Sequence, residues 1–265
     1  MSATKSITHQ LIAVSLAISL LLNATPGSSV HPARHRGVLA PSKSLPRPGI
    51  VIVVGGVGGI DFVTFAAQWA LPRAGVRHEI REFIWTHGKG HLFKDLQDTR
   101  NSLQKSNELA GEIRRLKAAD PDRPLFLIGK SGGSGLVLAA AEQLPEQSIE
   151  RIILLSAAVS TTYDLRPALR ATKHEIVSFY SPFDRLILDW GTRNFGTIDR
   201  YYGPSAGMRG FKVPRNLSAP EERLHDRLVQ LPWNPRMILE GNTGGHIGTS
   251  MPAFMAKEVA PWLKP

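Results

Sequence analysis

From residue 50 onward, short runs of β-branched and other apolar residues alternate along the chain with longer stretches whose apolar residues recur at helical spacing. Runs that are apolar throughout are typical of strands buried on both faces, and strands that alternate with helices favour a mostly parallel sheet. We therefore predict an α/β fold with a mostly parallel central sheet flanked by helices. The expected strands are 50–54, 79–85, 125–128, 151–155, 175–180 and 237–239, and the expected helices are 62–71, 103–118, 135–144 and 253–263.

The length of 265 residues suffices for one full α/β core and is too short for two large domains. We expect the catalytic or binding core to be a single domain at residues 49–265. Before it, residues 28–48 are rich in serine and proline without periodicity, which predicts a flexible linker.

Residues 1–27 have the three-part layout of a secretory signal: one lysine and no acid, an apolar run at 11–22, and then the breaker-rich segment 23–27. The apolar run is shorter than the roughly 20 residues that a membrane-spanning helix needs. We expect export to the periplasm or the medium. An uncleaved N-terminal membrane anchor is the alternative, because the segment lacks a clean small-x-small cleavage pattern.

The amino-acid composition limits the kinds of catalysis and of binding partner that we expect. The chain has no cysteine, which excludes thiol catalysis and disulfides. Its formal charge of +10 comes from basic residues that are scattered along the chain rather than gathered in one run. We expect contact with anionic surfaces, such as phospholipid or cell-wall polymer, and no nucleic-acid partner.

A serine sits in a glycine-flanked turn after the expected strand 125–128. Residues 129–133 read GKSGG and precede the helical stretch 135–144, so the pattern G-x-S-x-G falls between a strand and a helix, the setting of a nucleophile elbow. A Cβ at either glycine would collide where strand and helix fold back on each other. The strained turn places the hydroxyl at a helix N-terminus, whose dipole favours a developing anion. We predict that Ser131 is a catalytic nucleophile.

A second glycine cluster, GGVGG at residues 55–59, follows the expected strand 50–54. Its backbone amides can approach a substrate oxygen because almost no side chains stand in the way. If Ser131 attacks a carbonyl, we expect the amides of Gly132 and Val57 to hold the oxyanion. A tight turn that needs positive φ is the alternative explanation of these glycines.

Nucleotide and metal sites are poorly supported. Pro124 stands where a Walker loop needs a glycine, and Asp61 occupies the sixth position of the dinucleotide fingerprint. His87 and His91 with nearby Asp95 could mimic a metal cluster, but glycines between the histidines argue against a helix that would align them, and no closed ligand set accompanies them. We expect no metal and no cofactor; these histidines could line the mouth of the cleft.

A serine hydroxyl needs a base to take its proton. Of nine histidines, His246 stands apart, because it lies in a glycine-rich loop, residues 241–248, after the last expected strand. Such a loop lets an imidazole reach across the sheet edge. We predict His246 as the general base.

The third member of a triad should be a carboxylate beyond a strand that precedes the last one. Asp184 follows the expected strand 175–180 through a proline turn. The chain order is then Ser131, Asp184, His246, which is nucleophile, acid and base. Asp164 is the alternative acid, although a role at a helix start explains it as well.

With these motifs in place, residues 49–265 resemble the α/β-hydrolase superfamily, in particular exported bacterial lipase- or esterase-like serine hydrolases that lack a large cap domain. The resemblance implies a sheet of the eight-strand type. Two features depart from lipases: Lys130 precedes the nucleophile where histidine is common, and the glycine loop at 55–59 lacks a preceding histidine.

We therefore expect a carboxylic-ester hydrolase that cleaves an ester or related acyl bond of a small molecule or lipid through a Ser-His-Asp triad and an acyl-enzyme. An acyltransferase and a non-catalytic ligand-binding protein of the same fold are the alternatives. The weakly periodic segment 189–233 is expected to overhang the cleft. Four aromatic residues of this segment are expected to line the acyl pocket: Phe195, Tyr201, Tyr202 and Phe211.

Overall fold

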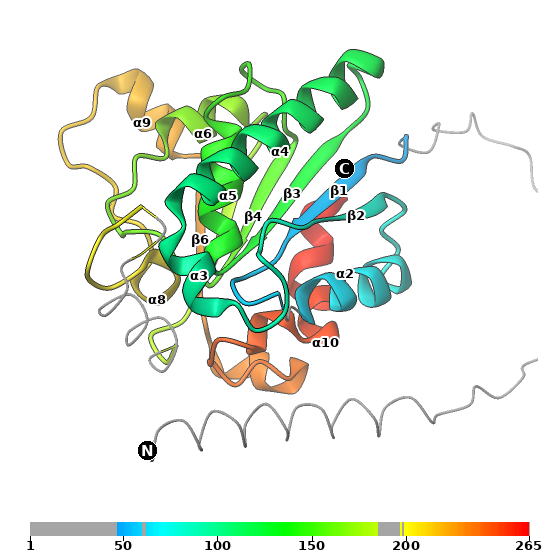
Figure 1. Ribbon diagram of the computed structural model, residues 1–265, viewed down its shortest axis with the longest axis vertical. Coiled ribbons are helices and arrows are strands. Elements are labelled where there is room, and N and C mark those ends of the chain that lie inside the picture. Colours follow the sequence, from blue (N-terminus) through cyan, green and yellow to red (C-terminus); the bar gives the residue numbers. More distant parts are fainter. Residues whose placement is uncertain (1–46, 60–61, 185–196, 198, 265) are drawn as a thin grey trace, which may run out of the picture. The chain divides into compact units, whose positions relative to one another are not determined.

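The computed structural model describes residues 47–59, 62–184, 197 and 199–264 (Figure 1). The segment that follows residue 45 forms one compact unit. The expected export signal and the expected linker up to residue 46 lie outside the described residues. Within the part that is described, no helix has the length and apolar character to cross a membrane.

The core is a six-stranded sheet whose strands all run parallel, in the order β2-β1-β3-β4-β5-β6. The predicted fold class, a parallel sheet flanked by helices in a single domain, is confirmed. The four central strands are apolar and buried along nearly their whole length, because helices cover both faces of the sheet. The strands are β1 (Ile50–Val54), β2 (Glu79–Phe83), β3 (Leu125–Lys130), β4 (Arg151–Leu155), β5 (Ile176–Tyr180) and β6 (Leu228–Pro232).

The sheet divides the core into two layers because successive side chains of a strand point to opposite faces. On β1, Ile50, Ile52 and Val54 pack with residues of α4, α5 and α6, whereas Val51 and Val53 pack with residues of α2 and the C-terminal helices. The principal helices are α2 (Phe62–Arg73), α3 (Leu92–Gln97), α4 (Thr99–Ala119), α5 (Gly132–Ala141) and α6 (Arg166–Ala171). The shorter ones are α8 (Ala206–Arg209), α9 (Ala219–His225), α10 (Pro252–Phe254), η2 (Pro235–Glu240), η3 (Gly248–Ser250), η4 (Met255–Val259) and η5 (Ala260–Leu263).

The strand order reverses between β1 and β3. From β1 the chain passes outward to β2 and then returns to place β3 on the other side of β1. At such a switch point the connections leave the two strands on opposite faces of the sheet, which opens a crevice at the carboxyl ends of the strands. The glycine loop after β1 and the serine turn after β3 therefore border the same crevice.

The last strand is not where the sequence predicts it. Residues 237–239 belong to the 3-10 helix η2, which begins at Pro235 and leaves Ile238 and Leu239 exposed. The true sixth strand, β6, lies inside the segment 189–233 that was expected to be a flap. As an edge strand it is only partly buried and carries Gln230 and a terminal proline, so it lacks the apolar run of the central strands.

Candidate active site

Ser131 is the residue between β3 and α5, and its backbone is strained, with φ 53° and ψ −122°. Positive φ is uncommon for a residue with a side chain. The flanking glycines are required sterically. A Cβ on Gly129 would lie 2.7 Å from the Cα of Ser134, and one on Gly133 would lie 2.3 Å from the carbonyl oxygen of Gly55. The turn therefore has the tight geometry that the G-x-S-x-G pattern predicts.

The backbone of Ser131 is held on both sides, whereas its hydroxyl is not. Its N–H donates to the carbonyl of Leu155, and its carbonyl accepts from the amides of Ser134 and Ala158. The hydroxyl makes no hydrogen bond to any residue that the structure describes. The hydroxyl thus lies at the N-terminus of α5 without a hydrogen bond to a described residue, and the helix dipole there favours negative charge on its oxygen.

Asp184 and His246 are brought together by the fold. Oδ2 of Asp184 lies 2.7 Å from Nδ1 of His246, and the aspartate is buried, with 2% of its surface exposed. An ionised carboxylate only accepts hydrogen bonds, so Nδ1 carries the proton and Nε2 is left as the basic nitrogen. Asp184 follows β5 through a turn in which its own amide donates to the carbonyl of Ser181. The pair has the arrangement of the acid and base of a triad.

A buried lysine connects the serine turn to the histidine loop. Nζ of Lys130 donates to the carbonyl of His246 at 2.6 Å and to Oγ1 of Thr249 at 3.0 Å, with only 4% of the lysine surface exposed. Because Lys130 immediately precedes Ser131, these bonds keep the loop that carries the imidazole next to the elbow. Hydrogen bonds between catalytic groups are often long without substrate and shorten in the complex.

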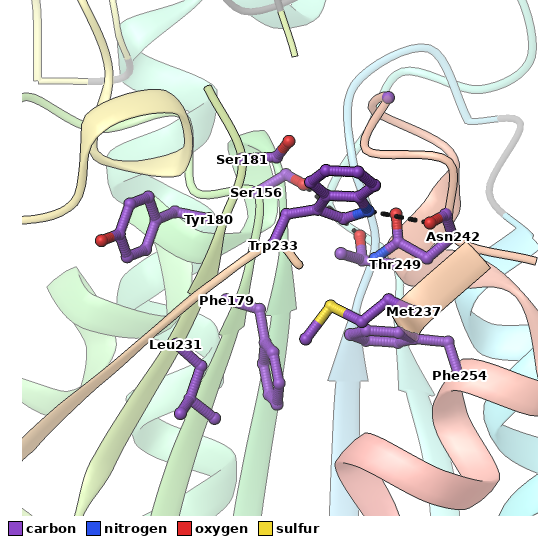
Figure 2. Close-up of a pocket in the computed structure, with 11 residues that line it drawn as sticks. Ser156, Phe179, Tyr180, Ser181, Leu231, Trp233, Met237, Asn242, Thr249 and Phe254 are labelled. Carbon is purple, nitrogen blue, oxygen red and sulfur yellow. Dashed lines mark hydrogen bonds between the residues drawn. The ribbon is translucent and has the colours of Figure 1, made fainter. Parts of the chain in front are cut away.

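The histidine loop is further fixed from the β6 side. Nε1 of Trp233 donates to the carbonyl of Asn242 at 2.8 Å, and Oγ of Ser156 lies 3.4 Å from Oγ1 of Thr249 (Figure 2). A cavity of about 10 Å³ lies among these groups and Ser181, which is room for about one water molecule. His246 thus lies on a loop whose backbone is held by several hydrogen bonds.

The two residues whose amides are expected to form the oxyanion hole, Val57 and Gly132, are in close contact. A Cβ built on Gly132 would come within 3.0 Å of Cγ1 of Val57, so the glycine loop packs directly on the first turn of α5. Neither the Val57 amide nor the Gly132 amide donates a hydrogen bond to a described residue. Unpaired N–H groups beside a nucleophile are suited to bind a developing oxyanion.

The alternative acid lies elsewhere. Asp164 is exposed, accepts from the backbone amide of Arg166 at 3.1 Å, and forms an ion pair with the same residue at 2.8 Å. Hydrogen bonding to the guanidinium lowers the pKa of the Asp164 carboxyl. The structure therefore places Asp164 at the start of α6 and brings Asp184, rather than Asp164, to His246.

The remaining candidates are distributed over the surface and the core. Phe195 lies outside the described residues, Tyr201 and Tyr202 are exposed, and Phe211 is buried in the core beneath α5 and α6 and lines a separate cavity near Thr162. The structure thus gives no support for Phe211 as part of an acyl pocket.

His87 is held by two carboxylates. Its ring contacts Asp95 at 2.8 Å and Asp98 at 3.2 Å, whereas His91 is exposed. No cluster of histidine, aspartate and glutamate side chains suited to a metal is found among the described residues. The contacts of Lys130 and Asp95 could not be predicted, because lysine and aspartate side chains are ordinarily solvated.

The six strands are parallel and in this order, the glycine-flanked serine turn follows β3, Asp184 follows β5 and His246 lies beyond β6. The chain has the α/β-hydrolase fold. In this fold all three candidate catalytic residues follow the carboxyl ends of strands, Ser131 after β3, Asp184 after β5 and His246 after β6.

No model of a known protein family matches the chain, and no curated protein matches it in sequence. Among solved structures, it is similar to a novel cutinase-like protein from Cryptococcus sp., with 15% identity over 84% of this chain and 98% of that one, at a TM-score of 0.45. A lipase-esterase related protein from Clostridium acetobutylicum shares 11% identity over 83% and 96% of the two chains, with a TM-score of 0.45. At such low identity and TM-score, the likeness carries no conclusion about substrate or reaction.

Proposed function

We propose that the protein is a serine hydrolase that cleaves an ester or related acyl bond. The observation that carries the proposal is the buried pair of Asp184 and His246, which Lys130 ties to the strained turn that presents Ser131. The contact between Asp184 and Nδ1 of His246 supports a role for Nε2 as the base, and no redox or thiol chemistry is required of the chain.

In the proposed reaction, Nε2 of His246 takes the proton of Ser131 as Oγ attacks the acyl carbon. The amides of Val57 and Gly132 donate to the oxyanion of the tetrahedral intermediate. Collapse of the intermediate breaks the bond to the alcohol, which leaves with the proton from the imidazolium. Water then attacks the acyl-enzyme, His246 accepts its proton, and the acid is released as Ser131 recovers its hydrogen. Asp184 stays ionised throughout and stabilises the imidazolium.

The test is turnover of p-nitrophenyl esters of graded acyl length, together with covalent labelling by a fluorophosphonate. Ser131→Ala is expected to abolish both and to leave the fold intact, because it removes a hydroxyl that bonds to no described residue. Ser134→Ala is the matched control. Its hydroxyl donates to the carbonyl of Gly129, and its loss should leave most of the turnover.

The outcomes separate the candidate functions. A wild-type protein that neither labels nor turns over any ester would be a binding protein, and turnover that persists in Ser131→Ala would remove the nucleophile assignment. Products formed with an added alcohol, in preference to free acid, would instead identify an acyltransferase.

We propose, in addition, that the protein acts outside the cytoplasm on a small-molecule or lipid ester. The signal-like residues 1–27 and the excess of basic residues support this proposal. Fractionation of cells that express the full chain tests it, since recovery in the cytoplasm alone would contradict export.

A further inference from the structure

A second buried carboxylate lies beside the proposed oxyanion loop and takes no part in the triad. Asp95 of α3 has only 1% of its surface exposed. Oδ2 accepts from the amide of Gly58 at 2.7 Å, and Oδ1 accepts from the amide of His87 at 2.8 Å and contacts Nδ1 of the same histidine at 2.8 Å. A charge that is buried in this way persists only because hydrogen-bond donors surround it.

These bonds join two loops that are far apart in sequence. The loop after β1, residues 55–59, is tied through Gly58 to the loop after β2, residues 84–91. The amide of Gly90 donates to the carbonyl of Gly58 at 2.9 Å, and Nε1 of Trp85 donates to the carbonyl of Gly55 at 2.8 Å. The loops are also in close steric contact, since a Cβ on Gly59 would lie 2.7 Å from the carbonyl carbon of Gly88.

The hydrogen bond from Gly58 to Asp95 holds the glycine loop, residues 55–59, whose backbone few side chains restrict. A loop with four glycines in five residues has many accessible conformations, and its amides are oriented only where something holds them. The N–H of Gly58 belongs to the peptide group that joins it to Val57. Binding this N–H to Asp95 therefore fixes the peptide plane that follows Val57 and restricts the directions open to the Val57 amide, which donates to no described residue.

We propose that Asp95 is a positioning residue for the oxyanion hole: its carboxylate sets the conformation of the glycine loop and thereby the direction of the Val57 amide. This inference rests on the proposed hydrolase function. His87 adds to this arrangement, because Nδ1 of its ring contacts the Asp95 carboxylate at 2.8 Å and Nε2 contacts Asp98 at 3.2 Å.

Asp95→Asn is the sharpest variant because it keeps the shape of the side chain. Both carboxylate oxygens accept from backbone N–H groups, so an asparagine must turn its own NH₂ group toward one of them, and one donor then faces another donor. With the Val57 amide misdirected, we expect kcat to fall about 10²-fold, the size of the loss when one oxyanion donor is removed. KM should change little, because the oxyanion exists only in the transition state.

Thr172→Val is the matched control. Thr172 is fully buried at the end of α6, and its hydroxyl donates to the carbonyl of Ala168 at 2.7 Å. Its replacement also removes a buried side-chain hydrogen bond, but at a place that touches none of the proposed catalytic groups. Both variants should lower Tm, and only Asp95→Asn should lower kcat.

Two further measurements complete the test. The rate of labelling by a p-nitrophenyl phosphonate, whose phosphoryl oxygen occupies the oxyanion hole, should fall in Asp95→Asn in parallel with kcat/KM. Amide hydrogen exchange of Gly58, followed by NMR, should be slow in the wild type and fast in the variant, and it needs no substrate.

The outcomes keep this inference distinct from the proposed function. Wild-type kcat in Asp95→Asn, with Ser131→Ala inactive, overturns the role of Asp95 and leaves the hydrolase intact. Equal loss of kcat in Thr172→Val shows a general effect of destabilisation and also overturns it. A wild-type protein that is inert to esters and phosphonate removes the proposed function, and the role of Asp95 with it.

Discussion

Replacing Asp184 by asparagine isolates the electrostatic part of the proposed triad. The side chain keeps its shape, but the neutral amide no longer requires a proton on Nδ1 of His246. Oδ2 lies 2.7 Å from Nδ1 in a site where 2% of the aspartate surface is exposed, so solvent does not replace the lost charge. The wrong tautomer and the unstabilised imidazolium should reduce kcat about 10⁴-fold. At about 1.36 kcal/mol per tenfold change, this is roughly 5.4 kcal/mol of transition-state free energy.

The same substitution should leave the fold stable. Oδ1 of Asp184 is buried and has no hydrogen-bond partner among the described residues, so these residues compensate the carboxylate incompletely. A neutral amide lessens this cost. We therefore expect Tm to stay the same or to rise while kcat collapses, a combination that unfolding cannot produce. Circular dichroism melting and p-nitrophenyl ester kinetics on the same preparation measure the two quantities.

Asp164→Asn is the control for this prediction. Asp164 forms an exposed ion pair with Arg166, and such surface pairs contribute about 0–1 kcal/mol to folding. We expect wild-type kcat and a small decrease in Tm. If Asp164→Asn abolishes turnover, or if Asp184→Asn keeps more than about a tenth of it, the assignment of the acid is wrong.

Two further substitutions test features that the triad does not include. Lys130→Met removes the hydrogen bonds from Nζ to the carbonyl of His246 and to Thr249. We expect kcat to fall roughly 10²-fold, as it does when a catalytic group is slightly misplaced. A wild-type kcat would show that these hydrogen bonds are not needed for turnover. Burial raises the pKa of Glu240, and repulsion from Glu258 raises it further. The stability that Glu240 contributes is therefore fully present below the pKa of this group in the unfolded chain, and it is lost as the pH rises through the pKa of the group in the folded protein. Glu240→Gln should therefore raise the Tm measured at about pH 8 more than the Tm measured at about pH 4, and an equal effect at both would contradict the burial argument.

The central strands and the nucleophile turn were predictable because their signals are local. A strand buried on both faces is a continuous apolar run, as in residues 151–155, which the sequence places with the same limits as the structure. The serine turn is likewise encoded within five residues, since only glycine fits at Gly129 and Gly133 where strand and helix meet.

The edge strand β6 and the short helix η2 were not predictable in the same way. Gln230 and Pro232 are tolerated in β6 because one side of the strand has no partner. Ile238 and Leu239 mimic a buried strand although they are exposed. Whether residues 228–232 or residues 237–239 form the last strand depends on which segment pairs with β5, and this pairing is a tertiary contact.

The fold class could be predicted from the amino-acid sequence alone, and so could Ser131, His246 and Asp184 as candidate catalytic residues. Which aspartate contacts the histidine depends on tertiary packing, and so do the contacts of Lys130 with the His246 loop and of Asp95 with the glycine loop. These are contacts between residues separated by 37 to 116 positions. No local pattern specifies such contacts, because a buried charge is stabilised by whichever donors and acceptors the packed strands and loops bring to it.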